Sequence, residues 1–316
     1  MIKEIAPVVI FIYKRENKFR RLIDTLRPLK PKKLFVVADG PKNNADLFII
    51  NKTRGVLKEV DWDTEILTNF SEKNMGADLR VPTGLDWVFD NVEKCIMLED
   101  DRIVDESFFH FATYILNKYE NDQRIGYVAG NTPVTLNNLK GDYFFSRFYF
   151  LPTFGTWRRV WKNRVRNYQE INDEDYKKNI YKILKNKRFA ETKIKSYEKQ
   201  KYQTNPPIWD FMWGVYCGMN NLLAVYHKNN LSQNDGNDEY AFHPGQMLPF
   251  IDFFKKAPPI KKVEFPIIDP PEVTENYEFI KQINKKKYAL IPFLYEKILG
   301  RIYWLLKKLR IINIRL

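Results

Sequence analysis

The first hundred residues alternate four times between short apolar runs and segments whose apolar residues recur at helical spacing. The runs Val8–Tyr13, Leu34–Ala38 and Cys95–Leu98 are continuous, as in strands buried on both faces, and Thr64–Asn69 reads as a weaker strand. Helical segments separate the runs, and Pro28 ends the first helix. Strands that alternate with helices in this way predict a right-handed, doubly wound α/β unit with a mostly parallel sheet.

The helix before the last of these strands is predicted to begin at Thr83. Asp86 follows three residues later, an arrangement like a capping box with Asp in place of Glu. Leu85, Val88 and Phe89 would form the apolar face of this helix.

Three carboxylates end the fourth strand, because its apolar run continues without a turn into Glu99, Asp100 and Asp101. Like charges at the end of a buried strand repel one another unless a cation or a set of hydrogen-bond donors is bound there. In open α/β sheets, ligands bind at the carboxyl ends of the strands. The alternative is that Asp100 or Asp101 caps the next helix and the other acids are solvated. A cap needs one acid rather than three, so we interpret the cluster as a ligand site.

The net charge of +13 is concentrated in two segments of the 316-residue chain. Residues 281–316 carry +9 and residues 177–201 carry +8, which leaves −4 for the remainder. A basic surface of the kind that binds nucleic acid would be spread over the body of the protein, so no nucleic-acid partner is expected.

The cysteines and the start of the chain indicate the cellular compartment. Cys95 and Cys217 have no partner at metal-ligand spacing and are expected to be reduced and buried. The first residues lack the apolar region of a signal peptide, and no apolar run reaches the ~18 residues of a membrane span. The sequence therefore predicts a protein of the cytoplasmic side.

Carboxylate oxygens at a strand end favour particular ions and reactions. Such ligands select Mg²⁺ or Mn²⁺, which bind through one or two carboxylates and the phosphates of a substrate. The first strand is followed by neither Gly-x-Gly-x-x-Gly nor a Walker-type Gly-Lys-Ser/Thr, which argues against NAD-linked and P-loop chemistry. Phosphoryl, nucleotidyl and glycosyl transfer remain. In glycosyl transfer the ion neutralises the diphosphate leaving group, and a general base takes the proton of the acceptor hydroxyl.

Five short motifs together resemble the nucleotide-sugar glycosyltransferases of the GT-A fold. In chain order they are Val8–Tyr13 with Lys14-Arg15, Val36–Gly40, Asn74-Met75-Gly76, Leu98–Asp101 and Trp209-Asp210. The similarity is greatest to the family-2-like group and to inverting N-acetylglucosaminyltransferases that carry a Glu-Asp-Asp version of the Asp-x-Asp motif. The resemblance implies a GT-A-like fold with a donor half and an irregular acceptor half.

The resemblance also implies roles for single residues of the donor half. Asp101 would ligate the metal, while Asp100 and Glu99 would hydrogen-bond the ribose and the donor sugar. Asp39 would accept a hydrogen bond from the nucleobase, and Arg15 would lie near the base or the diphosphate. The residues alone leave two alternatives open, with Asp39 as a turn residue and Arg15 as a solvated charge at a helix start.

The acceptor half contributes a candidate base. Residues 152–157, followed about fifty residues later by 208–211, resemble the part of the inverting enzymes in which a Trp-Asp pair supplies the general base. Asp210 would be that base, partly desolvated beside Trp209 so that its pKa rises. The alternative is that Asp210 is part of a helix cap.

His243 is a further candidate ligand. It follows a polar segment suited to a loop, and in some GT-A enzymes a late histidine completes the metal shell. The histidine is either a metal ligand or an ordinary surface residue.

The chain is divided by these motifs into three parts. Residues 1–104 form the nucleotide-sugar-binding half, residues 105–255 the acceptor-binding half, and residues 256–316 a basic C-terminal tail. A lysine-rich helical insertion near 166–205 is expected to be solvated. In 289–316 apolar and basic residues fall on opposite helical faces, which is typical of a helix lying in an anionic membrane surface. The alternative is a C-terminal helix packed on the body.

The sequence thus predicts a metal-dependent inverting glycosyltransferase that uses Mn²⁺ or Mg²⁺. The donor would be a nucleotide-diphosphate sugar, with UDP-sugars expected first, and the acceptor a hydroxyl of a glycan or lipid-linked glycan in cell-envelope polysaccharide synthesis at the inner face of the cell membrane. One rival is a sugar nucleotidyltransferase, which would carry a Gly-rich loop where this chain has Tyr13–Asn17. The other is a non-catalytic membrane-bound scaffold.

Overall fold

The computed structural model describes residues 4–149, 151, 153–203, 206–235 and 258–288. In the first hundred residues, strands and helices alternate as the sequence predicts. They are β1 (Val8–Ile12), α1 (Glu16–Leu26), β2 (Lys33–Ala38), α2 (Asn44–Gly55), the 3-10 helix η1 (Val56–Glu59), β3 (Glu65–Phe70), α3 (Ala77–Asn91) and β4 (Lys94–Glu99).

Beyond the carboxylate cluster the elements are shorter and less regular. They are β5 (Arg102–Val104), α4 (Glu106–Lys118), β6 (Ile125–Ala129), β7 (Tyr143–Ser146), β8 (Phe154–Trp157), α5 (Arg158–Trp161), the 3-10 helix η2 (Tyr168–Glu170), α6 (Asp173–Leu184), α7 (Lys187–Gln203), α8 (Trp209–Met219), β9 (Leu223–His227), β10 (Ser232–Asn234), α10 (Tyr277–Ile283) and the π-helical turn η3 (Asn284–Tyr288).

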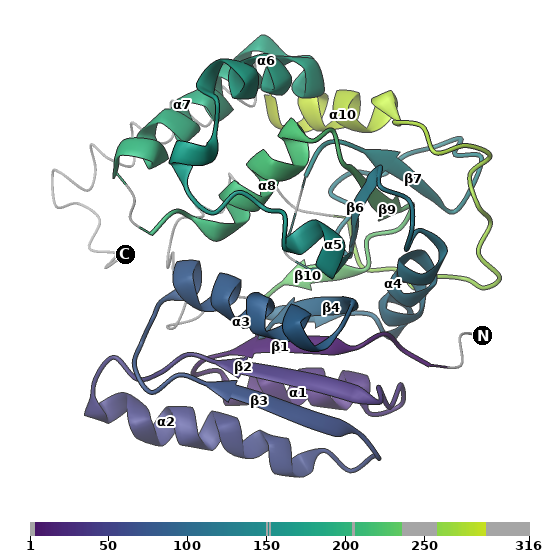
Figure 1. The fold of residues 1–316 in the computed structure, drawn as a ribbon. Helices are drawn as coiled ribbons and strands as arrows, with labels where there is room; N and C mark the ends of the chain where they lie inside the picture. Colours follow the sequence, from purple (N-terminus) through teal and green to yellow (C-terminus); the bar gives the residue numbers. More distant parts are fainter. Residues whose placement is uncertain (1–3, 150, 152, 204–205, 236–257, 289–316) are drawn as a thin grey trace, which may run out of the picture.

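Eight of the described strands form one sheet in the order β3-β2-β1-β4-β8-β6-β9-β7 (Figure 1). The strands β3, β2, β1 and β4 run parallel to one another, as do β6 and β9. Figure 1 shows α1 behind the strands and α3 in front of them, as right-handed crossovers require. The fold class is therefore the predicted α/β class, doubly wound and mostly parallel in its first half.

The first half is held together by the apolar runs that identified it in the sequence. All five residues of β1 are buried, and α1 turns Phe19, Leu22, Ile23 and Leu26 toward the core. Burial on both faces is what a central parallel strand requires. The carboxyl ends of β1, β2 and β4 consequently lie side by side at one edge of the sheet.

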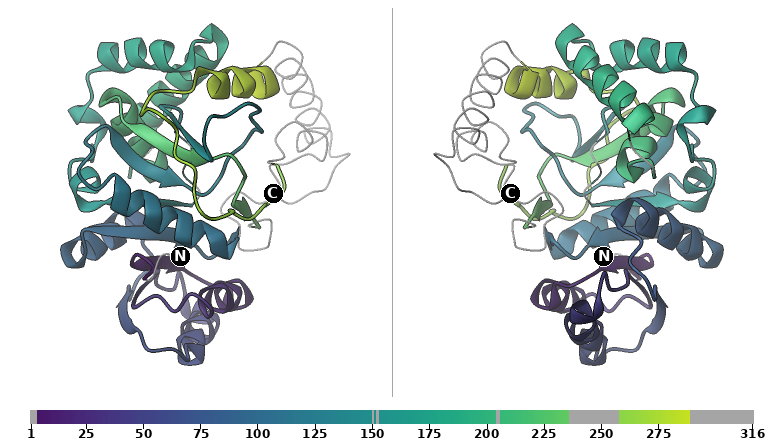
Figure 2. Two further views of the ribbon diagram at one scale, coloured as in Figure 1. Left: turned by 90° about the vertical axis from the view of Figure 1, so that its right-hand side faces the viewer. Right: turned by 90° about the vertical axis from the view of Figure 1, so that its left-hand side faces the viewer.

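The second half joins the first through antiparallel strands. β8 lies antiparallel between β4 and β6, and β7 lies antiparallel to β9 at the far edge. A small separate sheet pairs β5 with β10 directly after the carboxylate cluster. Figure 2 shows that the N-terminal strands and the helices α6 and α7 occupy opposite ends of the molecule.

The lysine-rich helices α6 and α7 are less solvated than the sequence suggested. Tyr176, Ile180 and Leu184 of α6 are buried, as are Phe189 and Tyr197 of α7. Only the outer face of each helix carries exposed lysines. The two helices pack on each other, and α6 packs on α8, so the segment belongs to the body of the protein.

The predicted helix start at Thr83 is wrong. Helix α3 begins at Ala77 after Gly76, whose φ of +74° is in the left-handed region that favours glycine. Pro82 and Thr83 lie inside the helix, and the Thr83 hydroxyl donates to the Leu79 carbonyl (2.8 Å). Asp86 accepts from Arg164 instead of capping a helix.

Two predictions concern residues outside those that the structure describes. One is the metal-ligand assignment of His243, and the other is the amphipathic helix of residues 289–316. Among the described helices, none has the length and apolar character needed to cross a membrane.

Candidate active site

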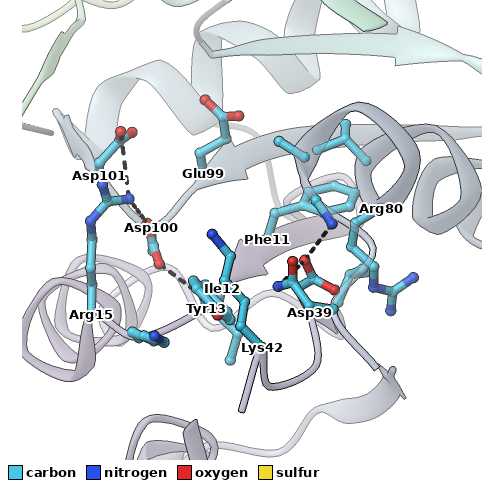
Figure 3. Close-up of a pocket in the computed structure, with 16 residues that line it drawn as sticks. Phe11, Ile12, Tyr13, Arg15, Asp39, Lys42, Arg80, Glu99, Asp100 and Asp101 are labelled. Atoms are coloured by element: carbon cyan, nitrogen blue, oxygen red, sulfur yellow. Dashed lines mark hydrogen bonds and ion pairs between the residues drawn. The ribbon is translucent and has the colours of Figure 1, made fainter. Parts of the chain in front are cut away.

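A cavity of about 580 Å³ opens at the carboxyl ends of β1, β2 and β4 (Figure 3). Small-molecule sites in proteins span about 300–1,000 Å³, so this cavity has the size of a ligand site. Its lining residues are Phe11, Ile12, Tyr13, Lys14, Arg15, Val37, Asp39, Lys42, Asn74, Gly76, Ala77, Arg80, Val81, Glu99, Asp100 and Asp101. Five of the predicted site residues therefore share one cavity.

Asp100 is the most buried of the three acids at the end of β4. Its Oδ1 lies 2.8 Å from Arg15 Nη1, and its Oδ2 accepts from the backbone N–H of Tyr13 (3.1 Å). Burial raises the pKa of Asp100 to about 6 although Arg15 opposes this shift. The Arg15–Asp100 pair fixes the loop after β1 to the end of β4.

Asp101 lies between two guanidinium groups. Its Oδ2 is 3.8 Å from Arg15 Nη1, and its Oδ1 is 3.2 Å from Arg102 Nε but accepts no hydrogen bond. The Asp101 carbonyl accepts from the backbone N–H of Asp235 (2.8 Å), which follows β10. The position of Asp101 is therefore set from both sides, and its Oδ1 is buried against Arg102.

Glu99 points to the opposite side of the strand from Asp100 (Figure 3). Burial, followed by the charges of Asp101, Asp100 and Asp210, raises the pKa of Glu99 to about 7, and Arg102 opposes this shift. The effect of Asp210 indicates that it lies within electrostatic reach of this strand end.

Glu99→Gln is expected to stabilise the protein without ligand at pH 8 by about 1–2 kcal/mol, and to leave it nearly unchanged at pH 4. Folding raises the pKa of Glu99, so its stabilising effect is complete below about pH 4 and is lost as the pH rises through about 7. Glutamine is neutral throughout. The measurement is urea unfolding at several pH values of the variant, the wild type and the exposed control Glu93→Gln. A difference in unfolding free energy between Glu99→Gln and the wild type that stays constant across pH would contradict the prediction.

The carboxylate of Asp39 is occupied by hydrogen bonds from neighbouring groups and is not an open acceptor. Its Oδ1 accepts from the backbone N–H groups of Gly40 and Met75 (both 2.8 Å), and its Oδ2 accepts from Gly76 N–H and Asn74 Nδ2 (both 2.9 Å). Four hydrogen bonds use the approximately four lone-pair positions of a carboxylate. In this arrangement no acceptor position of Asp39 is left for the predicted hydrogen bond from a nucleobase, and the carboxylate instead holds residues 74–76 at the wall of the cavity.

Two arginines, the buried Arg80 and the half-buried Arg54, complete the surroundings of Asp39. Arg54 donates to the Asp39 carbonyl (3.2 Å), and Arg80 donates to the Ala38 carbonyl (3.0 Å). Burial lowers the pKa of both guanidinium groups, and the charge of Asp39 acts in the opposite direction. A Cβ on Gly40 would lie 2.4 Å from the backbone of Lys73, so the close approach of the two loops needs glycine there.

Asp39→Asn is expected to destabilise the protein by about 2–4 kcal/mol, because an amide cannot accept all four hydrogen bonds, and because the change removes the countercharge of the buried Arg80 and the half-buried Arg54. The midpoint of urea unfolding measures the change. The control is Asp24→Asn, which removes a carboxylate that is 58% exposed. Equal midpoints for the two variants would show that Asp39 does not hold the loop.

Asp210 lies in the first turn of α8, and the helix is seated by two contacts. The backbone N–H of Trp209 donates to Asp78 of α3 (3.2 Å), and the Trp209 ring stacks on Phe154 of β8. Asp210 itself is exposed, so the expected desolvation by its aromatic neighbours is wrong. Asp210 is not among the residues that line the cavity.

The structure adds a basic residue that sequence reasoning missed. Figure 3 shows Lys42 extending from the loop after β2 into the cavity, between Asp39 and Asp100. The loop is fixed because Asp46 accepts from the Lys42 backbone N–H (2.9 Å) and the Tyr13 hydroxyl (3.1 Å). Only the position of Lys42 two residues after Gly40 could have suggested this role.

The donor atoms suit a divalent cation that shares its ligands with a substrate. No cluster of three or more His, Cys, Asp or Glu side chains among the described residues could hold an ion alone. Asp101 lines the cavity, and its Oδ2 lies 3.8 Å from Arg15 Nη1. Mg²⁺ and Mn²⁺ are commonly held by one or two carboxylates and substrate phosphates, so Asp101 fits this type of site.

No protein-family model and no curated protein matches the chain. Among solved structures, it is similar to a mannosyltransferase from Pyrobaculum calidifontis in complex with GDP-Man and Mn²⁺, at 8% identity and a TM-score of 0.33, covering 49% of this chain and 45% of that one. The chain thus spans less than half of that protein.

Two further structures are similar over more of their length. Mouse xyloside xylosyltransferase 1 has 10% identity and a TM-score of 0.36, with 70% of this chain and 84% of that chain covered. The 4-diphosphocytidyl-2C-methyl-D-erythritol synthase of Anaerococcus prevotii has 12% identity and a TM-score of 0.37, with 78% and 94% covered. Similarities of this size concern the fold alone.

Proposed function

We propose that this protein is a metal-dependent, inverting glycosyltransferase that uses a nucleotide-diphosphate sugar. The observation that carries the proposal is the cavity at the carboxyl ends of β1, β2 and β4, in which Glu99, Asp100 and Asp101 meet Arg15 and Lys42. Ligands of open α/β sheets bind at this edge. Carboxylates for a cation and cations for phosphate oxygens are the groups that a nucleotide diphosphate requires.

The donor would lie along the cavity with its base toward β2. Phe11 and Val37 offer an apolar wall for the base, while Lys42 and Arg15 offer charges for the diphosphate. Asp101 would hold Mn²⁺ or Mg²⁺ together with the phosphates, and the bound ion would neutralise the charge of the leaving diphosphate. Because Asp39 is fully hydrogen-bonded, the base would be recognised by other groups of the wall.

Transfer would proceed by a single displacement. The acceptor oxygen forms a bond to the anomeric carbon as the bond from that carbon to the diphosphate oxygen breaks, and the diphosphate leaves with the electron pair. Asp210 would take the proton of the acceptor hydroxyl. Attack from the face opposite the leaving group inverts the anomeric configuration.

The test is the release of the free nucleotide, UDP, GDP or CMP, from UDP-, GDP- and CMP-linked sugars with and without Mn²⁺. We expect one donor to be used in the presence of metal, and NMR of the product to show the inverted anomer. Retained configuration would exclude the single displacement. No release from any donor, with no donor binding by calorimetry, would favour a non-catalytic scaffold.

The sugar nucleotidyltransferase remains the rival within the same fold. Such an enzyme would release pyrophosphate from a nucleoside triphosphate and a sugar phosphate, so the same assay with UTP and GTP separates the two reactions. The connection from β1 to α1 is only Tyr13-Lys14-Arg15, without glycine. This short loop supports the glycosyltransferase, because a triphosphate cradle is commonly built from a Gly-rich loop.

We further propose that the protein works on a glycan or lipid-linked acceptor in envelope polysaccharide synthesis, at the cytoplasmic face of an anionic membrane. The support is the basic amphipathic pattern of residues 289–316. Sedimentation with anionic and with neutral vesicles tests it, and equal binding to both would contradict it.

A further inference from the structure

Two guanidinium groups enclose the three carboxylates at the end of β4. Arg15 Nη1 lies 2.8 Å from Asp100 Oδ1 and 3.8 Å from Asp101 Oδ2. Arg102 lies 3.2 Å from Asp101 Oδ1 through Nε and 3.7 Å from Glu99 Oε2 through Nη2. Each carboxylate thus faces at least one arginine, and Asp101 faces one on each side.

Little water reaches these ion pairs. The side chains of Arg102 and Asp100 are 6% and 5% exposed, and those of Arg15 and Asp101 are 14% and 16% exposed. Charges at such distances interact strongly where water is scarce. A divalent cation that approached Asp101 in the free protein would meet two positive groups already within 4 Å of the oxygens it needs.

The two arginines differ in their surroundings. Arg102 belongs to β5, where it is paired with Asn234 of β10, and its side chain is nearly buried. Arg15 is the residue that precedes α1, and it lines the cavity in which a diphosphate would lie. A diphosphate offers Arg15 a further anionic partner, as guanidinium groups bind phosphate well.

We propose that Arg15 and Arg102 are internal counter-ions that keep divalent cations out of the free protein, so that the cation binds only together with a nucleoside diphosphate. In the complex the diphosphate shares Arg15 with Asp100 and brings negative charge that the cation balances. The inference rests on the proposed function only in taking a nucleoside diphosphate as the ligand. The dependence of cation binding on the nucleoside diphosphate then follows from the charges around Asp101.

Electron paramagnetic resonance of free and bound Mn²⁺ tests the proposal on the full chain. Titrations are made with protein alone and with UDP, GDP or CDP present. We expect the wild type to bind Mn²⁺ at least tenfold more weakly alone than with the accepted nucleotide. We expect Arg15→Gln, measured without nucleotide, to bind Mn²⁺ at least tenfold more tightly than the wild type.

Two further variants separate charge from structure. Arg15→Lys keeps the positive charge and is expected to stay close to the wild type without nucleotide. Arg20→Gln removes a charge from the outer side of the same helix, where Arg20 pairs with Glu16 and Glu59, and is expected to leave Mn²⁺ binding unchanged. Thermal unfolding of each variant establishes that it is folded.

The proposal is overturned if the wild type binds Mn²⁺ equally well with and without nucleotide, or if Arg15→Gln alone binds it no better than the wild type. Failure of the proposed function is a different result. In that case calorimetry detects no nucleotide binding to the wild type, while the nucleotide-free comparison of Arg15→Gln with the wild type still reports on the counter-ions.

Discussion

Asp210→Asn is expected to lower the rate of sugar transfer by about 10²–10⁴-fold and to leave donor affinity within about twofold of the wild type. General-base catalysis contributes rate factors of this size, and an amide cannot take the proton of the acceptor hydroxyl. Donor affinity should persist because Asp210 does not line the cavity. The measurements are transfer rates at saturating donor, and calorimetry with the same donor.

Glu106→Gln is the matched control for this variant. Glu106 is an exposed acid in the first turn of α4, as Asp210 is in α8, so both changes remove a charge from a helix start. The control should transfer sugar at the wild-type rate. Wild-type turnover in Asp210→Asn would remove the proposed base and direct attention to Glu99, whose pKa of about 7 would suit a base.

Asp101→Ala is expected to abolish the stimulation of transfer by Mn²⁺, with a loss of about 10³-fold or more at saturating metal. A bound ion supplies several kcal/mol of charge stabilisation to a leaving diphosphate, and Asp101 is the cavity-lining acid proposed to hold that ion. Nucleoside diphosphate release with and without Mn²⁺ measures the effect. Calorimetry of Mn²⁺ with the nucleotide present tests metal binding directly.

Removing Asp101 also leaves Arg102 with fewer partners, so a conservative variant is needed. Asp101→Asn keeps the shape of the side chain and is expected to lose metal stimulation while remaining folded. Asp63→Ala removes a carboxylate that is 94% exposed and serves as the control. Full metal stimulation in Asp101→Asn would mean that the cation is held elsewhere.

The parts of the fold that the sequence predicted are those governed by local pattern. The apolar runs of β1, β2 and β4 are buried because nothing but a central parallel strand suits such runs, and the acids after β4 then had to lie at the ligand-binding edge. Five residues of the cavity could consequently be predicted from the sequence without any knowledge of side-chain contacts.

The features that could not be predicted from the sequence depend on contacts between distant segments of the chain. Asp39 looked like a free acceptor because its four hydrogen-bond donors come partly from residues 74–76, which are remote in the chain. The same contact places the start of α3 at Ala77, so the capping pattern at Thr83 was misleading. Likewise, Asp210 is exposed although two aromatic residues flank it, since neighbours in a helix point in different directions.

The segment that contains β7 and β8 could not be predicted from the sequence either. Strands β7 and β8 are only four residues long, and their pairing with β9, β4 and β6 joins segments separated by long connections. Short strands carry too few residues to show a period of two clearly.

The position of β8 affects whether the chain can be divided into separately folded fragments. The second neighbour of β4 in the sheet is β8, because Lys94–Met97 pair with Phe154–Trp157. A fragment that stopped at the carboxylate cluster would leave β4 as a bare edge, with unpaired backbone groups beside an apolar surface. Such edges invite pairing between molecules. The donor-binding half is therefore expected to aggregate when it is produced by itself, and recombination with another acceptor half would have to supply a strand in the place of β8.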